Sequence, residues 1–569
     1  MHDLEPTVRK YALQNAVQFN GRANPGAVIG KIMAEREELR ANAKEAMPQI
    51  NRIIAEVNGM GLEAQKAALE SLAPELLERK KKARNYSLPD LPNAVDGKVV
   101  TRFPPEPNGY LHIGHAKAAI IDCEYARKYN GKFILRYDDT NPEKESKEFY
   151  EAQASDLRWL GVEWDEEYCT SSRLMRHYEL AEQLISQGDA YVCSCSGDTI
   201  KGNRFDRREC ACRSLPPADQ MKRWKEMFLA PAGTAILRLK GDIKSNNTAM
   251  RDPTLARIID AEHPVQGKKY RVWPTYDFVG AVEDSDSGVT HPFRTKEYEL
   301  RDEVYFYVLD RLGLRKPTLM EFSRLAIEGM PVSKRLIKPL IDEGRVTGYD
   351  DPRLPTLRGL RRRGLQPEAI RQFVLTQGTS KVESTVTFDQ VEAINRKLLD
   401  PKAKRFFFVP SPVRLIVHGA PNSKVTLRFH PTEELGNREI ETSHVFFIPG
   451  ADASALAAGT LFRLKDLYNV RVDRIEEDGT IYGSHAGEGI APDTLKLQWV
   501  TEDHVALTVS KPGLLFVDGK YNENSAETVT GYAEKAVLCV HDEVVQFERF
   551  GFCRIESCGR QIKAFYTHK

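Results

Sequence analysis

The spacing of apolar and polar residues divides the chain into three stretches that differ in their expected secondary structure. Residues 1 to about 84 are rich in Ala, Glu, Arg, Ile and Met, with a helical pattern over 28–57 that continues in the same style over 63–82. The stretch closes on the basic run 79–84, and a Ser- and Pro-containing segment typical of a linker follows. We expect a helical unit whose basic run is either a solvated helix end or a contact to an RNA backbone.

The second stretch alternates strands and helices. Residues 98–103 have the pattern of a strand, and a Pro- and Gly-rich loop, a helix over 116–129 and a second strand over 132–137 follow. A further helix is expected over roughly 144–160. The order strand, loop, helix, strand begins a βαβ unit, so we expect an α/β domain built on a parallel sheet.

The third stretch begins near residue 404 and consists of short alternating strands separated by turn residues. This pattern predicts β-barrels or sandwiches. No fixed-period repeat is visible, which argues against a solenoid. The expected strands are 413–418, 424–430, 445–448, 470–472, 495–500 and 505–509.

Composition and charge narrow the class of protein. The 569 residues suffice for three or four domains, and 41% hydrophobic with 29% charged residues excludes a disordered or collagen-like chain. Lys and Arg number 82 against 81 Asp and Glu, so any nucleic-acid surface must be local. We expect no membrane segment and no signal peptide, because no apolar run approaches 18 residues and the start carries acids. Nine cysteines, few and odd in number, favour a reducing cytoplasm over a disulfide scaffold.

The loop 102–115 carries the most specific chemistry. It joins the first strand to the first helix of the βαβ unit, where open α/β sheets bind ligands and a helix N-terminus favours anions. His112 and His115 are three residues apart, so on a helical turn they share a face and could hydrogen-bond phosphate oxygens. Gly114 would let a ligand approach closely. Two histidines at this spacing, taken alone, favour a metal pair or buried core histidines. The three prolines, Asn108-Gly109 and the strand-to-helix context favour the ligand site instead.

These residues resemble a known family. Segment 105–115, Pro-Glu-Pro-Asn-Gly-Tyr-Leu-His-Ile-Gly-His, resembles the HIGH signature of class I aminoacyl-tRNA synthetases of the glutamyl/glutaminyl branch. Segment 330–335, Met-Pro-Val-Ser-Lys-Arg, is similar to that branch's form of the KMSKS loop, and segments 135–142, 273–278 and 350–364 resemble its other motifs. The resemblance implies a Rossmann-type catalytic domain that uses ATP with Mg²⁺.

The resemblance also assigns site residues. His112, His115 and Lys334 are the expected catalytic residues, the histidines holding the ATP and Lys334 neutralising the phosphates as charge moves onto pyrophosphate. A lysine in a Ser-Lys-Arg triplet is otherwise most often just solvated. The expected ATP-binding residues are Pro105, Glu106, Asn108, Gly109, His112, Gly114, His115, Ser333, Lys334 and Arg335.

The choice between glutamate and glutamine depends on Arg294. The resemblance places an arginine here in glutamyl enzymes and a neutral residue in glutaminyl enzymes, and a guanidinium offers only donors, which suit a carboxylate. The alternative for Arg294 is a surface salt bridge with Glu297 or Glu299. The other expected glutamate-binding residues are Arg102, Asp138 and Tyr276, with the pairing of each arginine to a carboxylate left open.

The β-rich end distinguishes subtypes within the branch. Bacterial glutamyl enzymes end in helical anticodon-binding domains, so Arg294 with β-barrels resembles the archaeal or eukaryotic glutamyl type. We expect an appended helical domain at 1–94 and a catalytic domain at 95–331 that carries an acceptor-stem-binding insertion at about 175–270. A loop and helical stem-contact domain would occupy 332–403, and anticodon-binding β-barrels 404–569.

Four cysteines form a possible metal site within the expected insertion. Cys193, Cys195, Cys210 and Cys212 make a CxC…CxC pair with 14 residues between, and four thiolates suit tetrahedral Zn²⁺. The alternative is four reduced structural cysteines, since CxC is less typical than CxxC. We expect a structural zinc.

The resemblance implies a glutamate–tRNA ligase that forms glutamyl-adenylate from ATP and L-glutamate and charges tRNA(Glu). Two alternatives stay open: a glutamine–tRNA ligase, and a non-catalytic tRNA-binding paralogue. Whether tRNA(Gln) is also charged is open too. We expect a cytoplasmic monomer whose N-terminal domain docks tRNA or another protein.

Overall fold

The computed structural model describes residues 4–18, 21–35, 43–73, 76, 88–490, 494–558 and 561–569. These residues form two compact units, Met1–Ser87 and Leu88–Lys569. The basic run 79–84 lies outside the described residues, so its predicted role stays a prediction. No helix in the described part of the chain is long and apolar enough to cross a membrane.

The N-terminal unit is helical, as predicted. Its core gathers aliphatic side chains such as Val8, Ile32 and Ile54, which are almost fully buried. The buried amide of Gln65 donates to the backbone carbonyls of Val57 and Met60, so the polar group costs little. The helices are α1 (Leu4–Gln18), α2 (Pro25–Glu35), α3 (Ala43–Asn58) and α4 (Leu62–Leu72).

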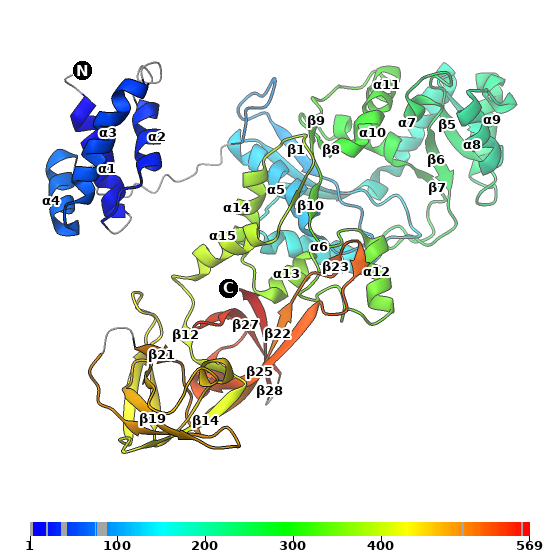
Figure 1. Cartoon of the computed structure of the whole chain (residues 1–569). Helices are drawn as coiled ribbons and strands as arrows, with labels where there is room; N and C mark the ends of the chain where they lie inside the picture. The colour runs from blue at the N-terminus through cyan, green and yellow to red at the C-terminus, as the bar shows by residue number, and fades with distance from the viewer. Residues whose placement is uncertain are drawn as a thin grey trace. The chain divides into compact units, whose positions relative to one another are not determined.

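The second unit begins with the predicted parallel sheet (Figure 1). Strands β1 (Val100–Phe103), β2 (Lys132–Tyr137) and β3 (Glu166–Cys169) pair in that order, all parallel. Hydrogen bonds between Val100 and Thr290 dock a second parallel pair, β8 (Phe293–Thr295) with β9 (Met320–Phe322), beside β1. Helix α5 (Ile113–Lys128) packs on β1, β2 and β8, and α6 (Lys147–Trp159) contributes Leu157 to the same core. Helices α10 (Tyr276–Asp286) and α11 (Asp302–Leu312) pack on each other and in the core of the inserted sheet described next.

A four-stranded antiparallel sheet is inserted between β3 and α10. It has its own core, in which Trp224 and Trp273 are fully buried. Its strands run in sequence order: β4 (Ala190–Cys193), β5 (Ile236–Leu239), β6 (Thr254–Ile258) and β7 (Val272–Pro274). Its helices are α7 (Leu174–Gln187), α8 (Gly197–Asp206) and α9 (Pro217–Met227).

A helical segment follows the β9 region. Its short parallel pair, β10 (Leu325–Ile327) with β11 (Ser384–Val386), brackets helices α12, α13 and α14. Helix α14 packs on α5, which ties this segment to the first sheet. The helices are α12 (Lys334–Asp342), α13 (Leu357–Arg363), α14 (Pro367–Gln377) and α15 (Asp389–Leu399).

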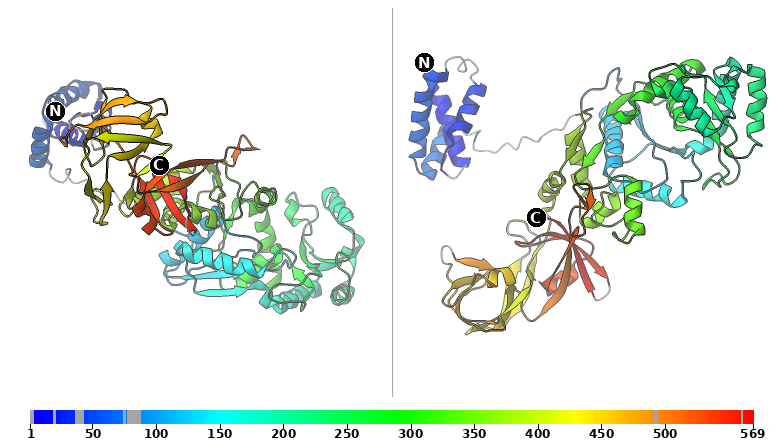
Figure 2. Two further views of the ribbon diagram at one scale, coloured as in Figure 1. Left: turned by 90° about the horizontal axis from the view of Figure 1, so that it is seen from below. Right: turned by 45° about the vertical axis from the view of Figure 1, so that its right-hand side comes forward.

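The chain ends in two neighbouring β domains, as Figure 2 shows. The six-stranded sheet has the order β17-β14-β20-β19-β18-β21 and the seven-stranded sheet the order β12-β26-β27-β28-β22-β25-β13. The predicted β-rich end is therefore confirmed. The six-stranded sheet comprises β14 (Pro412–His418), β17 (Val445–Pro449), β18 (Leu461–Leu464), β19 (Asn469–Ile475), β20 (Ile481–His485) and β21 (Leu495–Leu497). The seven-stranded sheet comprises β12 (Arg405–Phe406), β13 (Phe408–Pro410), β22 (His504–Pro512), β25 (Ala526–Glu534), β26 (Val544–Phe547), β27 (Gly551–Cys558) and β28 (Gln561–His568).

A hairpin from the second β domain reaches helix α12. The hairpin pairs β23 (Phe516–Val517) with β24 (Lys520–Tyr521), and Leu515 just before it packs with Ile337 and Leu340 of α12. Phe516 N–H donates to the carbonyl of Gly329 (3.2 Å) in the approach to that helix. The C-terminal domain thus contributes to holding α12 in place.

Candidate functional site

A cavity of about 520 Å³ opens at the carboxyl ends of β1 and β2. Six of the predicted site residues line it: Pro105, Glu106, Asn108, His115, Asp138 and Tyr276. Lys144 and Arg257 also line it, two cations that sequence reasoning did not single out. Lys144 follows Asp138 by six residues, whereas Arg257 belongs to strand β6 of the inserted sheet. Only the fold brings Lys144 and Arg257 to the same cavity.

A second cavity of about 240 Å³ adjoins the first and shares Pro105, Glu106, Asn108 and His115 with it. Here the two predicted signatures meet, because His112 and Ser333 both line this cavity, as does Gly109. Lys334 is the first residue of α12, and its side chain lies outside the described part of the structure. Arg335 is exposed and is not among the lining residues.

The two signature histidines are fixed at the start of α5. His112 is the residue before the helix, and its Nδ1 accepts from the N–H of Gly114 (3.1 Å). The N–H of His112 in turn donates to Nδ1 of His115 (3.3 Å), and the rings stack with centroids 3.8 Å apart. A Cβ at position 114 would lie 2.9 Å from Cε1 of His112. The close approach that glycine permits at 114 is therefore to the His112 ring.

These bonds set the protonation of both histidines. A ring nitrogen that accepts a hydrogen bond carries no proton, so each neutral imidazole carries its proton on Nε2. Burial lowers the pKa of His115 to about 4, and burial with the neighbouring His115 holds the pKa of His112 well below its usual value. Both rings are therefore neutral at physiological pH and offer an Nε2–H donor to an anion.

Asp138 is held at the cavity wall by a buried arginine. The Nε of Arg136 donates to one carboxylate oxygen of Asp138 (2.7 Å) and its Nη2 to the other (3.2 Å). The hydroxyl of Thr170 adds a third donor (3.0 Å). Asp138 thus presents an oriented carboxylate to the cavity, suited to an ammonium group.

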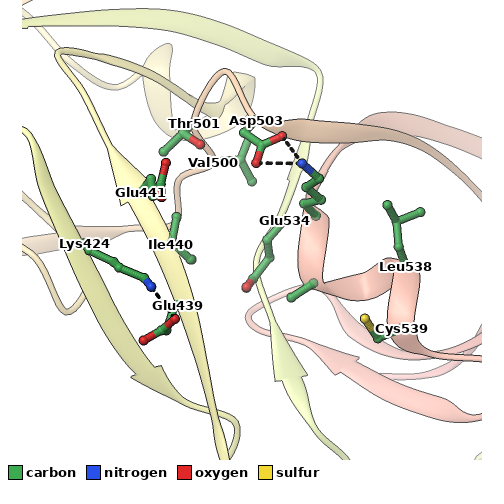
Figure 3. Close-up of a pocket in the computed structure, with 12 residues that line it drawn as sticks. Lys424, Glu439, Ile440, Glu441, Val500, Thr501, Asp503, Glu534, Leu538 and Cys539 are labelled. Carbon is green, nitrogen blue, oxygen red and sulfur yellow. Dashed lines mark hydrogen bonds and ion pairs between the residues drawn. The ribbon is translucent and has the colours of Figure 1, made fainter.

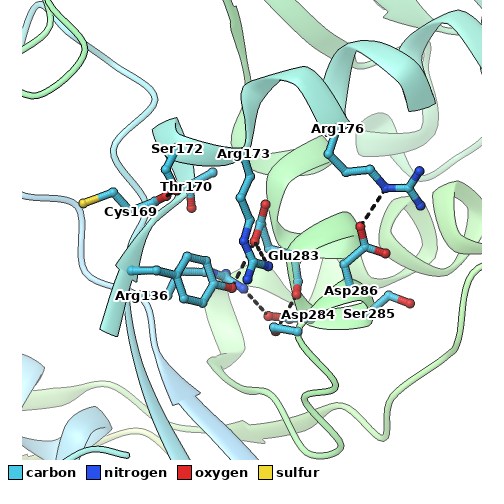
Figure 4. A network of polar contacts seen from close by, with 12 residues as sticks. Arg136, Cys169, Thr170, Ser172, Arg173, Arg176, Glu283, Asp284, Ser285 and Asp286 are labelled. Atoms are coloured by element: carbon cyan, nitrogen blue, oxygen red, sulfur yellow. Dashed lines mark hydrogen bonds and ion pairs between the residues drawn. The ribbon is translucent and has the colours of Figure 1, made fainter. Parts of the chain in front are cut away.

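Asp284 joins the arginines behind the cavity. Its carboxylate accepts from Arg102 (3.0 and 3.2 Å), Arg136 (2.8 Å) and the hydroxyl of Tyr305 (3.1 Å); Figure 4 shows the Arg136 contact. Burial alone would raise its pKa, but Arg102, Arg136 and Arg294 lower the pKa of Asp284 to about 2. Sequence reasoning missed Asp284, since no motif marks this acid in the last turn of α10.

Arg102 is engaged in this buried network. Its Nη1 donates to the carbonyl of Phe293 (2.9 Å), and its Nε and Nη2 donate to Asp284. It does not line either cavity. The predicted direct contact of Arg102 to glutamate stays a prediction.

Arg294 lies on β8, and its side chain is 4% exposed. Its guanidinium faces the ring of Tyr305 (4.1 Å to the centroid) and is 5.6 Å from that of Tyr276, which lines the first cavity. Its carboxylate neighbour is Asp302 at 3.6 Å, in place of the surface partners Glu297 or Glu299 considered above. The Nε of Arg294 is buried without a hydrogen-bond partner. The result is a buried cation behind Tyr276 whose ion-pair partner, Asp302, is 3.6 Å away.

The four predicted zinc cysteines come together. Their sulfurs all lie within 4.8 Å of one another, and the Sγ atoms of Cys193 and Cys210 are 3.9 Å apart. Zn–S bonds of about 2.3 Å in a tetrahedron place sulfurs about 3.8 Å apart, so the donor set and spacing fit zinc. Cys193 ends β4, Cys195 precedes α8, and Cys210 and Cys212 follow that helix. Helix α8 itself has no buried residue and is bracketed by the cluster.

A further cavity of about 620 Å³ lies between a two-stranded hairpin and the end of β25 in the seven-stranded sheet (Figure 3). One wall is the hairpin of β15 (Ser423–Arg428) and β16 (Asn437–Thr442), and the other carries Glu534 and Leu538. Lys424 pairs with Glu439 (2.6 Å), and Lys535 pairs with Asp503 (2.9 Å). The walls combine these ion pairs with apolar side chains such as Ile440 and Leu538.

Comparisons with known proteins match this organisation. Residues 98–401 match the family described as tRNA synthetases class I (E and Q), catalytic domain, and 403–486 and 496–556 match two anti-codon binding domains of the same class.

Two curated relatives align over all of both chains. Glutamate–tRNA ligase of Nitrosopumilus maritimus is 45% identical over 573 residues, and glutamate–tRNA ligase of Cenarchaeum symbiosum is 44% identical over 571 residues. A crystal structure of glutamate–tRNA synthetase from Elizabethkingia anophelis overlaps 53% of this chain and 70% of that one, with a TM-score of 0.39 and 21% identity. That overlap is too partial to support an argument about function.

Proposed function

This chain belongs to the class I tRNA synthetases of the E and Q branch, and on that premise we propose that it is a glutamate–tRNA ligase of the archaeal type. The predicted α/β catalytic fold with anticodon-binding β domains is confirmed by the family matches. The enzyme would join L-glutamate to ATP, release pyrophosphate, and transfer the glutamyl group from the adenylate to the 3′ end of tRNA(Glu).

The activation step is an in-line displacement. The α-carboxylate of glutamate attacks the α-phosphorus of ATP, a phosphorus–oxygen bond breaks, and the electron pair leaves on pyrophosphate. Such a step depends on positioning and charge stabilisation more than on a general base. Mg²⁺ bound to the ATP phosphates, held largely by phosphate and water oxygens, would neutralise part of their charge.

The signature residues would serve the ATP. Because His112 and His115 are neutral with Nε2–H donors, they can hydrogen-bond phosphate oxygens without releasing a proton. Their cavity also contains Ser333, the residue before Lys334. We assign Lys334 to the leaving pyrophosphate, where its charge would count most as the bond breaks. The backbone of Pro105, Asn108 and Gly109 would border the nucleotide.

The amino acid would occupy the 520 Å³ cavity. The carboxylate of Asp138 suits the substrate ammonium, and Tyr276 lines the same cavity. Arg294, close behind Tyr276, is the cation that would meet the side-chain carboxylate. Among the residues that the structure describes, its buried Nε has no hydrogen-bond partner, which favours an anionic ligand.

The cysteine cluster would hold one Zn²⁺. Cys193, Cys195, Cys210 and Cys212 would be the four ligands, and the ion would fix the exposed helix α8 to the inserted sheet. Arg204, Arg207 and Arg208 at the end of α8 would then face the tRNA acceptor stem.

The C-terminal cavity is the candidate contact for the anticodon. Its lining of paired lysines and carboxylates can hydrogen-bond base edges of a single-stranded loop. The proposal leaves two questions to experiment. One is whether tRNA(Gln) is accepted besides tRNA(Glu), and the other is whether the N-terminal unit docks tRNA or a protein.

The observation that supports the proposal most is the meeting of both signatures in one cavity beside the cavity of Asp138 and Tyr276. The test is aminoacylation of separate tRNA(Glu) and tRNA(Gln) transcripts with each amino acid, together with ATP–pyrophosphate exchange with and without tRNA. We expect glutamate charging of tRNA(Glu). Charging with glutamine alone would establish the glutaminyl alternative, and the absence of exchange and charging would establish a non-catalytic tRNA-binding paralogue.

A further inference from the structure

The guanidinium of Arg294 is positioned more by packing against its neighbours than by hydrogen bonds. Its carboxylate neighbour Asp302 is 3.6 Å away, and its Nε has no partner. The ring of Tyr305 covers it at 4.1 Å. A buried side chain with so few directional contacts takes its position from the walls around it.

One of those walls is a glycine. Gly280 lies inside helix α10, one turn after Tyr276, and is buried. A Cβ built at position 280 would lie 3.1 Å from Nη2 of Arg294, closer than ordinary van der Waals contact. Glycine weakens the interior of a helix relative to alanine, so its presence in a buried helical position calls for a local reason. Here that reason is the space that the guanidinium fills.

The neighbours of the guanidinium limit the directions in which it can move. Tyr305 closes the face at 4.1 Å, and Tyr305 is itself fixed because its hydroxyl donates to Asp284. On the sheet side, Glu321 of β9 is the register neighbour of Arg294, and its Oε2 pairs with Lys381 (2.5 Å). A methyl group at 280 would therefore move the charged end of Arg294 by a few tenths of an ångström.

We propose that Gly280 is a specificity-determining position that acts through Arg294: its missing side chain gives the guanidinium the place from which it meets an acidic substrate. This inference rests on the proposed function, since it needs Arg294 to bind the side-chain carboxylate of glutamate. Gly280 is a positioning residue, because a Cβ there would meet Arg294 and the glycine itself does not line the cavity.

The first test is Gly280→Ala in the full-length protein. In this variant the misplaced guanidinium would bind the side-chain carboxylate of glutamate less well, in the ground state and the transition state alike. KM for glutamate should therefore rise about tenfold, while kcat should change less than about threefold. Use of glutamine should change little, so the preference for glutamate should narrow by about tenfold. The matched control is Gly30→Ala in α2, an exposed helical glycine with no atom within 4 Å of the new methyl, which should leave both constants unchanged.

A double-mutant cycle separates a role through Arg294 from a general loss of packing. Gly280→Ala is measured alone, in an Arg294→Cys background and in an Arg294→Lys background, with Tm for each protein. Because Cys and Lys both lack Nη2, the alanine should add less than about twofold to KM there. The Lys background also keeps the test usable if Gly280→Ala alone does not fold.

The outcomes are distinct. A tenfold effect that disappears in both backgrounds supports the inference, whereas equal effects in all three backgrounds, or no effect in the native background, overturn it. If Arg294→Cys itself leaves the glutamate preference intact, or the native enzyme does not use glutamate, the proposed function fails first and independently of Gly280.

Discussion

The imidazole of His115 accepts a hydrogen bond at Nδ1 from the backbone N–H of His112, and the two rings stack 3.8 Å apart. This bond leaves Nε2–H of His115 as the donor in the cavity. His115→Ala should therefore lower the rate of pyrophosphate exchange by about 10²–10³, as for loss of one preorganised donor. His115→Gln, whose amide can reach the Nε2 position, should lose less.

The same geometry predicts the pH dependence. The pKa of His115 is lowered to about 4 by burial, so above about pH 5 the ring is neutral, with Nδ1 accepting and Nε2–H donating. The exchange rate measured from pH 5.5 to 8 should show no fall on the acid side near 6.5 that is due to His115. An acid limb near 6.5 that is present in the native enzyme and lost in His115→Gln would contradict the neutral assignment.

We predict that Asp284 makes a large contribution to the free energy of unfolding. Asp284→Asn leaves buried Arg102 and Arg136 without their shared carboxylate, and breaking a buried ion pair costs about 3–5 kcal/mol. Tm and denaturant midpoints should fall accordingly. Asp286→Asn is the control in the same helix, because its exposed pair with Arg176 should contribute less than about 1 kcal/mol. Equal losses in the two variants would refute the buried network's role.

Lys334→Ala should lower the activation rate by about 10²–10³, roughly 3–4 kcal/mol, because the lysine would stabilise charge on the leaving pyrophosphate. Affinity for tRNA should change little. Lys338→Ala is the matched control, an exposed lysine one turn further along α12 that pairs with Asp342. An unchanged exchange rate in Lys334→Ala would remove this residue from the mechanism.

Zinc content can be measured directly. Purified protein should carry about one Zn²⁺, and Cys210→Ser should lose it and make the segment around α8 more sensitive to protease, since metal binding and local folding are coupled. Cys539→Ser, an exposed cysteine outside the cluster, should retain the metal. Elemental analysis that finds no metal in protein never exposed to chelator would contradict the zinc site.

Some of this architecture could be predicted from sequence and some could not. The strand, loop and helix around His112 follow from local patterning, and the cysteine spacing predicted a cluster whose sulfurs do converge. The partners of Arg102 and Arg294 could not be predicted. Asp284 lies 182 residues from Arg102 along the chain. Gly280 of helix α10 faces Arg294 of strand β8, so only tertiary packing reveals these two pairs.

The role of Gly114 illustrates the same limit. Its place between the two histidines indicates that close approach matters there, yet the sequence does not tell which group approaches. The structure shows that the approaching group is the His112 ring. His112 has an extended backbone just before the helix, and its imidazole lies back over position 114.

The central claim is that this enzyme selects an acidic amino acid through a buried cation. Glutamate and glutamine have nearly the same size, so charge must separate them. Binding the neutral amide would leave Arg294 poorly compensated, a loss of about 3–5 kcal/mol, which corresponds to several hundredfold or more in kcat/KM. Arg294→Cys should sharply lower kcat/KM for glutamate and reduce the preference for glutamate over glutamine. It should not create an efficient glutamine enzyme.

The most direct test is kcat/KM for glutamate and for glutamine with tRNA(Glu), measured on the native enzyme and on Arg294→Cys. The account predicts a native preference for glutamate of several hundredfold or more and a much smaller preference in the variant. A native preference for glutamine would contradict the assignment itself. A variant that keeps the full glutamate preference would show that Arg294 is not the selecting cation and leave Arg102 to carry that role.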